Sequence, residues 1–194
     1  MLADLVSRRR QVLDMLTMET NRLGAVRDRY VAGNIRKHVR ALQREIDQLD
    51  KRIGDRIQSD DDFREKSRIL RSAKGIGPQT TAMLLGHLPE IGPLNRAQIG
   101  ALAGLAPYTH RSGRYVGKAR IRGGRKEVRA ALYMAALVAL RWNPAIRRFA
   151  QHLVAQGKAS KVVITACMRK LLVILNTPVR NKTLWQSDYR PHTA

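Results

Sequence analysis

The chain has one cysteine, and this scarcity excludes two kinds of architecture. A disulfide framework needs paired cysteines, and a thiolate metal cluster needs several. Cys167 lies in the apolar run VVITACMRKLLVIL, where a small buried hydrophobe is the simplest interpretation. The histidines do not suggest zinc either, because none of the five shows ligand spacing: His38, His87, His110, His152 and His192.

Long apolar runs are missing too. The longest, Ala130–Leu140, falls far short of the roughly 20 residues that a transmembrane helix needs. The first ten residues, MLADLVSRRR, carry their charges after the apolar residues and lack the apolar core of a signal peptide. We therefore expect a cytoplasmic protein with no membrane partner.

Acidic residues are scarce in the second part of the chain. Residues 66–194 carry 23 Lys and Arg but only three acids, whereas residues 1–65 carry 14 basic and 12 acidic side chains. With 44% hydrophobic residues, such a chain can fold around a core while its basic part binds a polyanion, more readily nucleic acid than a membrane surface.

The same scarcity limits metal chemistry. A two-metal site needs several convergent carboxylates, and between Lys66 and Ser187 only Glu90 and Glu127 are available. The basic part therefore cannot build such a site alone. The acids of the first part, Asp47, Asp50 and Asp55, have Arg or Lys neighbours on a charged helix surface, which indicates surface ion pairs.

Hydrophobic residues in the first part recur at alternating spacings of three and four, which is typical of seam-forming helices. The economical interpretation is an antiparallel helical hairpin over residues 1–58, broken at Ala32-Gly33-Asn34; an intermolecular coiled coil is the rival. Its mixed charges are interpreted as a solvated face. The clearest seam is Ile35, Val39, Leu42, Ile46, Leu49 and Ile53.

Residues 59–180 are predicted to form a second, compact helical domain, followed by a loosely held tail over 181–194. The predicted capping residues are Ser59, Asn95 and Ser160. The fold class is therefore mainly α. The expected helices run from Ser59 to about Ala73, from Asn95 to near Gly104, and over 127–142, 145–156 and 161–176, the last ending before Pro178.

The stretch KGIGPQTTAMLLGHL, residues 74–88, predicts a tight connection between two helices. Gly75 and Gly77 can adopt positive φ, and the N–H groups at the start of the second helix could hold a phosphate. The pattern resembles the helix-hairpin-helix element of DNA repair and recombination proteins, here over about 63–88. Thr81 departs from it, because a small alanine is usual there. A plain helix connector is the alternative.

A second stretch, LAPYTHRSGRYVGKARIRGGRKEVR, covers residues 105–129 and surrounds one serine, Ser112, with cations. It has no clean helical or strand period, so we expect an irregular basic loop or a short β-hairpin insertion around Tyr108–Gly123. Arginines can neutralise the charge that develops when a hydroxyl attacks a phosphodiester. A serine in such a loop can equally be a hydrogen-bond donor to phosphate. The predicted DNA-binding residues are Gly75 and Gly77 of the first stretch and, in this one, Arg111, Gly113, Arg114, Lys118, Arg120, Arg122, Arg125, Lys126 and Arg129.

Three blocks together carry a family resemblance: GIGPQTTAMLLGHLPEIG, AGLAPYTHRSGRYVGKARIRGGRKEVRAALYMAALVALRWNP and KVVITACMRKLLVILN. They resemble the C-terminal transposase domain of the serine-carrying, bridge-RNA-guided insertion-sequence transposases, insertion sequence family one-hundred-ten and its relatives. The resemblance implies that Ser112, followed by Gly113, is the nucleophile that becomes linked to DNA. It also implies DNA and structured guide RNA as partners, a homo-oligomer (dimer or tetramer), and a bacterial protein associated with the nucleoid.

Full-length members of that family begin with a ribonuclease-H-like domain that carries four acidic metal ligands. This sequence begins after it, which suggests an excised domain, a decayed copy or a product of internal initiation. We expect no cofactor in the chain itself, and magnesium only together with the acidic domain. The resulting hypothesis is the DNA-recombining half of a transposase, inactive alone. The alternative is a non-catalytic nucleic-acid-binding or assembly module.

Overall fold

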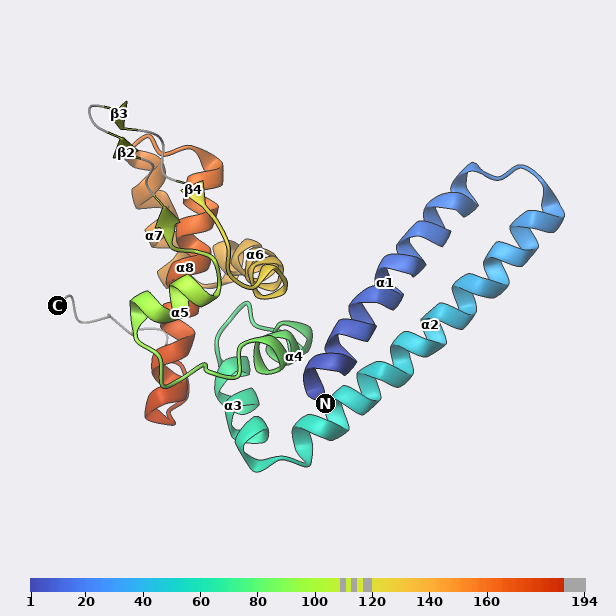
Figure 1. Cartoon of the computed structure of the whole chain (residues 1–194), viewed down its shortest axis with the longest axis horizontal. Coiled ribbons are helices and arrows are strands. Elements are labelled where there is room, and N and C mark those ends of the chain that lie inside the picture. Colours follow the sequence, from blue (N-terminus) through green and yellow to red (C-terminus); the bar gives the residue numbers. More distant parts are fainter. Residues whose placement is uncertain (109–110, 113–114, 117–119, 187–194) are drawn as a thin grey trace. The chain divides into compact units, whose positions relative to one another are not determined.

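The computed structural model describes residues 1–108, 111–112, 115–116 and 120–186. Two compact units divide at Asp61 and Asp62, one made of residues 1–61 and the other following it (Figure 1). Helices dominate both units, so the predicted mainly α class is confirmed.

The first unit is an antiparallel hairpin of two long helices, α1 (Leu2–Ala25) and α2 (Arg29–Gln58). Val12 of α1 is fully buried against three apolar residues of α2, namely Leu42, Ile46 and Leu49. The predicted seam is thus used within the chain. It is less complete toward the turn, where Ile35 and Val39 are half-buried.

The turn of this hairpin was predicted at the wrong place. α1 ends at Ala25 and α2 begins at Arg29, so Gly33 and Asn34 lie inside α2. The deciding residue is Asp28, whose carboxylate accepts a hydrogen bond from the Val31 N–H at 2.8 Å and caps the helix. A glycine inside a helix costs only about 1 kcal/mol, and a 30-residue helix packed along a seam tolerates it.

The second unit begins with α3 (Asp61–Ser72) and α4 (Pro78–His87), continues with α5 (Arg96–Leu102), and ends with α6 (Lys126–Trp142), α7 (Pro144–Ala155) and α8 (Ser160–Asn181). α8 packs against α5, α6 and α7, and α4 packs against α6. Fully buried residues in its core include Leu84, Ile99, Leu132, Ile146, Leu171 and Leu172.

Of the three capping predictions, one holds and two are wrong. The Asn95 side chain accepts hydrogen bonds from the N–H groups of Ala97 and Gln98, both at 2.9 Å, at the start of α5. Ser59, however, is the C-cap of α2, and its hydroxyl donates to the Arg56 carbonyl at 3.1 Å. It therefore ends one helix instead of starting the next.

The last helix differs from its prediction at both ends. Ser160 is its first residue and not its cap, and the helix continues through Pro178 to Asn181. Side chains from this final part bind the 92–94 loop: Asn176 accepts from the Gly92 N–H at 2.7 Å and donates to the Leu94 carbonyl at 2.8 Å. Arg180 donates to the Gly92 carbonyl and also to the Leu94 carbonyl, which it shares with Asn176. These contacts offset the hydrogen bond that proline removes.

Within the described part of the chain, one helix, α8, is long and apolar enough to meet the simple criteria for a membrane span. Many of its apolar side chains are buried by the rest of the unit, Cys167, Leu171 and Leu172 fully, although Val162 is exposed. Such burial is typical of a core helix. The same burial raises the pKa of the Cys167 thiol, as expected for a cysteine that serves as a small hydrophobe.

Candidate functional site

The segment around Ser112 forms two short antiparallel ladders, one nested inside the other. The outer ladder joins β1 (Pro107–Tyr108) to β4 (Arg120–Ile121), and the inner ladder joins β2 (Arg111–Ser112) to β3 (Tyr115–Val116). Ser112 pairs with Tyr115 in the inner ladder, and Arg111 pairs with Val116. Of the two forms expected for this insertion, an irregular loop or a short β-hairpin, the structure has the β-hairpin. Three predicted DNA-binding residues, Gly113, Arg114 and Lys118, lie outside the described residues.

The base of this β-hairpin is closed by glycines whose backbones nearly touch. Gly104 and Gly124 both have positive φ, +66° and +65°. A Cβ at Gly104 would overlap the Gly123 carbonyl oxygen, and one at Gly124 would overlap the Gly104 backbone. The Arg125 N–H donates to the Leu102 carbonyl at 2.9 Å. Only glycine allows the two chain segments at the base of the β-hairpin to approach each other this closely.

Arg125 joins the base of the β-hairpin to the helical body. Its guanidinium donates to both carboxylate oxygens of Glu90, at 2.5 and 2.6 Å, and to the His87 carbonyl at 3.0 Å. The hydrogen bonds from Arg125 lower the pKa of Glu90, and the carboxylate raises that of Arg125. The basic segment is therefore balanced by an acid at this position, because Glu90 reaches Arg125 across 35 residues of sequence.

The other described cations of the segment differ in whether they bind the protein itself or are exposed to solvent. Arg129 donates to the Gly123 carbonyl at 2.6 Å and so also holds the base of the β-hairpin. Arg120, Arg122 and Lys126 are exposed. Lys126 makes only a loose 3.9 Å contact with Glu127. Predicted DNA-binding residues therefore separate into a positioning pair, Arg125 and Arg129, and three cations that face solvent.

The α3–α4 connection lies where the helix-hairpin-helix was predicted, but its two glycines differ. Gly75 has φ of +102°, and a Cβ there would meet the Ala139 backbone of α6 at 3.1 Å. Gly77 has φ of −93° and serves as the N-cap of α4, with open space around it. Positive φ was thus predicted correctly for Gly75 and wrongly for Gly77.

Thr81, the residue that departs from the helix-hairpin-helix pattern, is buried inside α4. Its hydroxyl donates to the Gly77 carbonyl at 3.0 Å, so its polar group is satisfied within the helix. A cavity of about 420 Å³ lies beside the turn, between Gly75–Gly77 and the exposed α6 side chains Met134 and Val138. The surroundings of the turn are therefore partly apolar.

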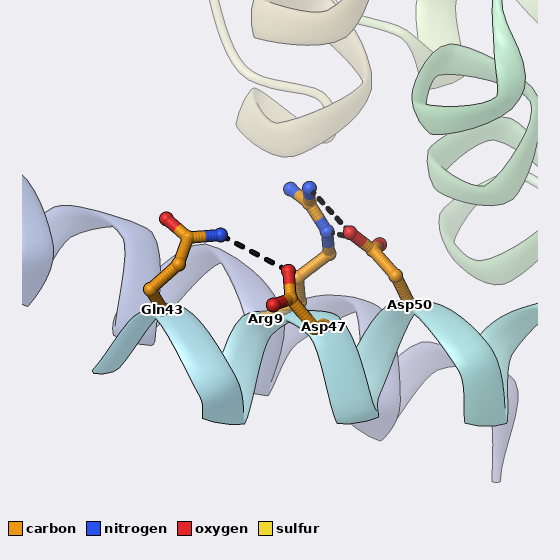
Figure 2. A network of polar contacts seen from close by, with 4 residues as sticks. All are labelled: Arg9, Gln43, Asp47 and Asp50. Atoms are coloured by element: carbon orange, nitrogen blue, oxygen red, sulfur yellow. Dashed lines mark hydrogen bonds and ion pairs between the residues drawn. The ribbon is translucent and has the colours of Figure 1, made fainter. Parts of the chain in front are cut away.

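No group of three or more His, Cys, Asp or Glu side chains comes together anywhere in the described part of the chain. In the helical hairpin, Asp50 receives two hydrogen bonds from Arg9, at 2.5 and 3.0 Å, while Asp47 receives one from Gln43 at 3.0 Å (Figure 2). The ion pair expected for Asp50 is confirmed. These two carboxylates therefore make contacts on the surface of the helical hairpin. The described residues do not bring together the ligands of a magnesium site.

Residues Glu90, Gly104, Gly124 and Asn143 were missed as positioning residues from the sequence. Asn143 is fully buried, caps α7, and donates to the Lys74 carbonyl at 3.3 Å. The pair Gly123-Gly124 and the isolated Gly104 were the available signals, because paired glycines mark places where backbones approach closely. Glu90 gave a weaker signal, as one of very few acids in a basic region.

Comparison with known proteins gives one family match and several relatives. Residues 67–151 match the transposase IS116/IS110/IS902 family. The pilin gene-inverting proteins of Moraxella bovis and Moraxella lacunata are each 33% identical over 155 residues, covering 78% of this chain and 48% of the relative. An uncharacterized 43.6 kDa protein of insertion element IS110 from Streptomyces coelicolor is 28% identical over 123 residues, 62% of this chain and 30% of its own. The chain spans about half the length, or less, of these curated relatives.

Proposed function

Because residues 67–151 form a transposase domain of the IS116/IS110/IS902 family, we propose that this chain is the strand-exchanging half of a DNA recombinase. The single observation that carries the proposal is the basic β-hairpin: a serine in a β-ladder, presented on a segment rich in Arg and Lys. The similarity to pilin gene-inverting proteins supports recombination as the reaction class.

In the proposed reaction, Ser112 is the nucleophile. Its Oγ attacks a DNA phosphorus atom, an Oγ–P bond forms, and the P–O bond to the adjacent deoxyribose breaks. The sugar oxygen leaves and takes up a proton, while the seryl proton passes to a base. The energy of the phosphodiester is kept in the seryl–DNA ester, so a second DNA strand can reverse the step.

The cations would act in two ways. Arg120, Arg122 and Lys126, which are exposed, would contact the phosphates that flank the cleavage point, together with Arg111, Arg114 and Lys118. Charge-assisted hydrogen bonds of this kind stabilise the negative charge that develops during attack. Arg125 and Arg129 would act through geometry, because they hold the base of the β-hairpin that carries Ser112.

The α3–α4 turn would add a sequence-independent contact, in which the N–H groups at Gly77 and the start of α4 approach a DNA phosphate. Gly75 would serve packing, since its approach to Ala139 leaves no space for a side chain. The carboxylates that bind activating metal ions would come from a domain outside these 194 residues. Relatives about twice as long leave room for such a domain.

The test is formation of a covalent protein–DNA adduct. The full-length protein, with its acidic domain, structured guide RNA and magnesium, should give a labelled adduct on a denaturing gel. Ser112→Ala should abolish the adduct while leaving DNA affinity within about tenfold, since one hydroxyl contributes about 0.5–1.5 kcal/mol of net hydrogen bonding. A neighbouring hydroxyl variant, Thr109→Val, serves as the matched control and should retain the adduct.

An adduct that survives Ser112→Ala would move the nucleophile to another residue. Tight DNA binding without any adduct in the full-length protein would favour the second candidate, a non-catalytic nucleic-acid-binding or assembly module. We place the protein in the bacterial cytoplasm, associated with the nucleoid, and expect a dimer or tetramer, because strand exchange joins at least two DNA ends.

A further inference from the structure

The helical hairpin separates its charges along its length. In α2, residues 29–44 carry five basic side chains and no acid, whereas residues 45–58 carry three basic and four acidic ones. The mixed charges expected of a solvated face are therefore not mixed in space. All five cations near the turn are exposed: Arg29, Arg36, Lys37, Arg40 and Arg44.

These five residues define the basic face of α2. Arg29, Arg36, Arg40 and Arg44 follow spacings of seven, four and four, which places them on one side of the helix. The opposite side carries the buried seam of Leu42, Ile46 and Leu49, so the basic face points away from α1. At 1.5 Å per residue, it extends over roughly 22 Å, the rise of about six base pairs.

The basic face lacks the ion pairs that satisfy the other end of the hairpin. There, Arg8 pairs with Glu45 and Arg9 with Asp50. Among the described residues, Arg29, Arg36, Lys37 and Arg44 have no acidic partner, and the Arg40 Nε reaches only the Arg36 carbonyl, at 3.3 Å.

The acids nearest the turn are already engaged. Asp28 caps α2, Glu19 pairs with Arg22 at 2.5 Å, and Asp14 pairs with Arg10 at 3.0 Å. Five like charges held on one rigid face repel each other. A polyanion would remove that repulsion without rearranging the hairpin.

We propose that the basic face of α2 is a second nucleic-acid contact, separate from the Ser112 β-hairpin, and that it binds the phosphate backbone of a double-stranded segment. Gly33 lies in the middle of this face and has open space around it, so a sugar–phosphate backbone can approach the helix closely there. Tyr30, 78% exposed beside Arg29, offers a ring for stacking at the end of the face. The site adds a contact to the proposed function and does not depend on Ser112 chemistry.

The test compares two double variants of the 194-residue chain. Arg36→Gln with Arg44→Gln removes two charges from the basic face. Lys51→Gln with Arg52→Gln removes two exposed charges from the other half of the same helix and is the matched control. Glutamine preserves helix propensity, and circular dichroism would check that helical content is unchanged in both.

Affinity is measured against salt for a duplex DNA and, separately, for an RNA stem of equal length. Because each phosphate contact contributes ~0.9 to the slope of log affinity against log salt on B-DNA, the Arg36/Arg44 variant should lower the slope by nearly two and weaken binding about tenfold. The control should stay within twofold. Whether DNA, RNA or both lose affinity identifies the source of the phosphates.

Two results would overturn the proposal. Equal losses from both double variants would show that only net charge matters and that the face is not a site. An unchanged slope, combined with a change of oligomeric state in sedimentation, would assign the face to the acidic part of a second copy of this chain.

Discussion

At the scale of single residues, the β-hairpin that carries Ser112 depends on a contact far away in sequence. Glu90 follows α4 and Arg125 precedes α6, and the two form a bidentate ion pair. Arg125 donates a third hydrogen bond to the His87 carbonyl. Both side chains are about one third exposed, so solvent screens part of their attraction. The pair matters more for where the β-hairpin points than for total stability.

Replacing Glu90 with Gln should lower the melting temperature at neutral pH by about 2–4 °C, the shift expected for roughly 1 kcal/mol in a chain of this size. The measurement is thermal unfolding followed by circular dichroism. Glu127→Gln, which removes only the loose 3.9 Å contact with Lys126, is the control and should leave the melting temperature unchanged.

The difference between wild type and Glu90→Gln should depend on pH. Arg125 lowers the pKa of Glu90 in the folded state. The stabilisation of the fold by the Glu90–Arg125 ion pair is therefore complete above the ordinary glutamate pKa of about 4.3. It is lost as pH falls through the lowered value. If the difference in melting temperature between wild type and Glu90→Gln stays the same below the lowered pKa of Glu90, the ion pair is not the cause of that difference.

At the scale of elements, local signals located most of the helices but not all of their ends. Asn95 was readable because a capping residue acts on its immediate neighbours. The hairpin turn was misplaced because glycine suggests a break, while the capping carboxylate of Asp28 decided it. The end of α8 was misjudged because Asn176 and Arg180 hold it through the 92–94 loop, more than 80 residues away.

In the candidate site too, local features could be predicted from the sequence and long-range contacts could not. The positive φ of Gly75 followed from a local glycine pattern. The lack of a clean helical or strand period marked the insertion around Ser112 but left an irregular loop and a short β-hairpin equally open. The partners of Arg125 and Arg129 could not be predicted, since an arginine that grips phosphate and an arginine that holds a loop look the same in sequence. Only the fold brings Glu90 within reach of Arg125.

The hairpin of α1 and α2 offers a test of its intramolecular seam. Leu42 is 4% exposed and packs in the cluster around Val12, so Leu42→Asp should destabilise this unit by about 3 kcal/mol or more, because a carboxylate would be buried without a partner. The neighbouring exposed position gives the control, Ala41→Asp, with an expected loss well below 1 kcal/mol.

The melting temperature of each variant would be recorded over a hundredfold range of protein concentration. A seam formed within one chain predicts the same temperature at every concentration, because no association is involved. A melt that rises strongly with concentration would instead indicate a coiled coil between chains.

At the scale of the whole molecule, the net charge is divided unevenly between the two compact units. The net charge of +22 comes almost entirely from residues 66–194, which hold only three acids. The helical hairpin is nearly balanced overall, yet concentrates its cations on the basic face of α2. Two basic surfaces on two compact units suit a protein that holds more than one segment of nucleic acid.

Binding of this chain to duplex DNA should therefore depend steeply on salt. If about five phosphates are neutralised, the slope of log affinity against log salt approaches −4.5, and affinity falls about twentyfold between 0.1 and 0.2 M salt. Fluorescence anisotropy with a labelled duplex measures the slope, and Ser112→Ala should share it because that substitution removes no charge. A duplex of the same sequence with neutral methylphosphonate linkages is the control, and its weak binding should hardly change with salt. A shallow slope with the natural duplex would mean that the basic residues do not contact phosphate, and it would contradict the nucleic-acid function at its foundation.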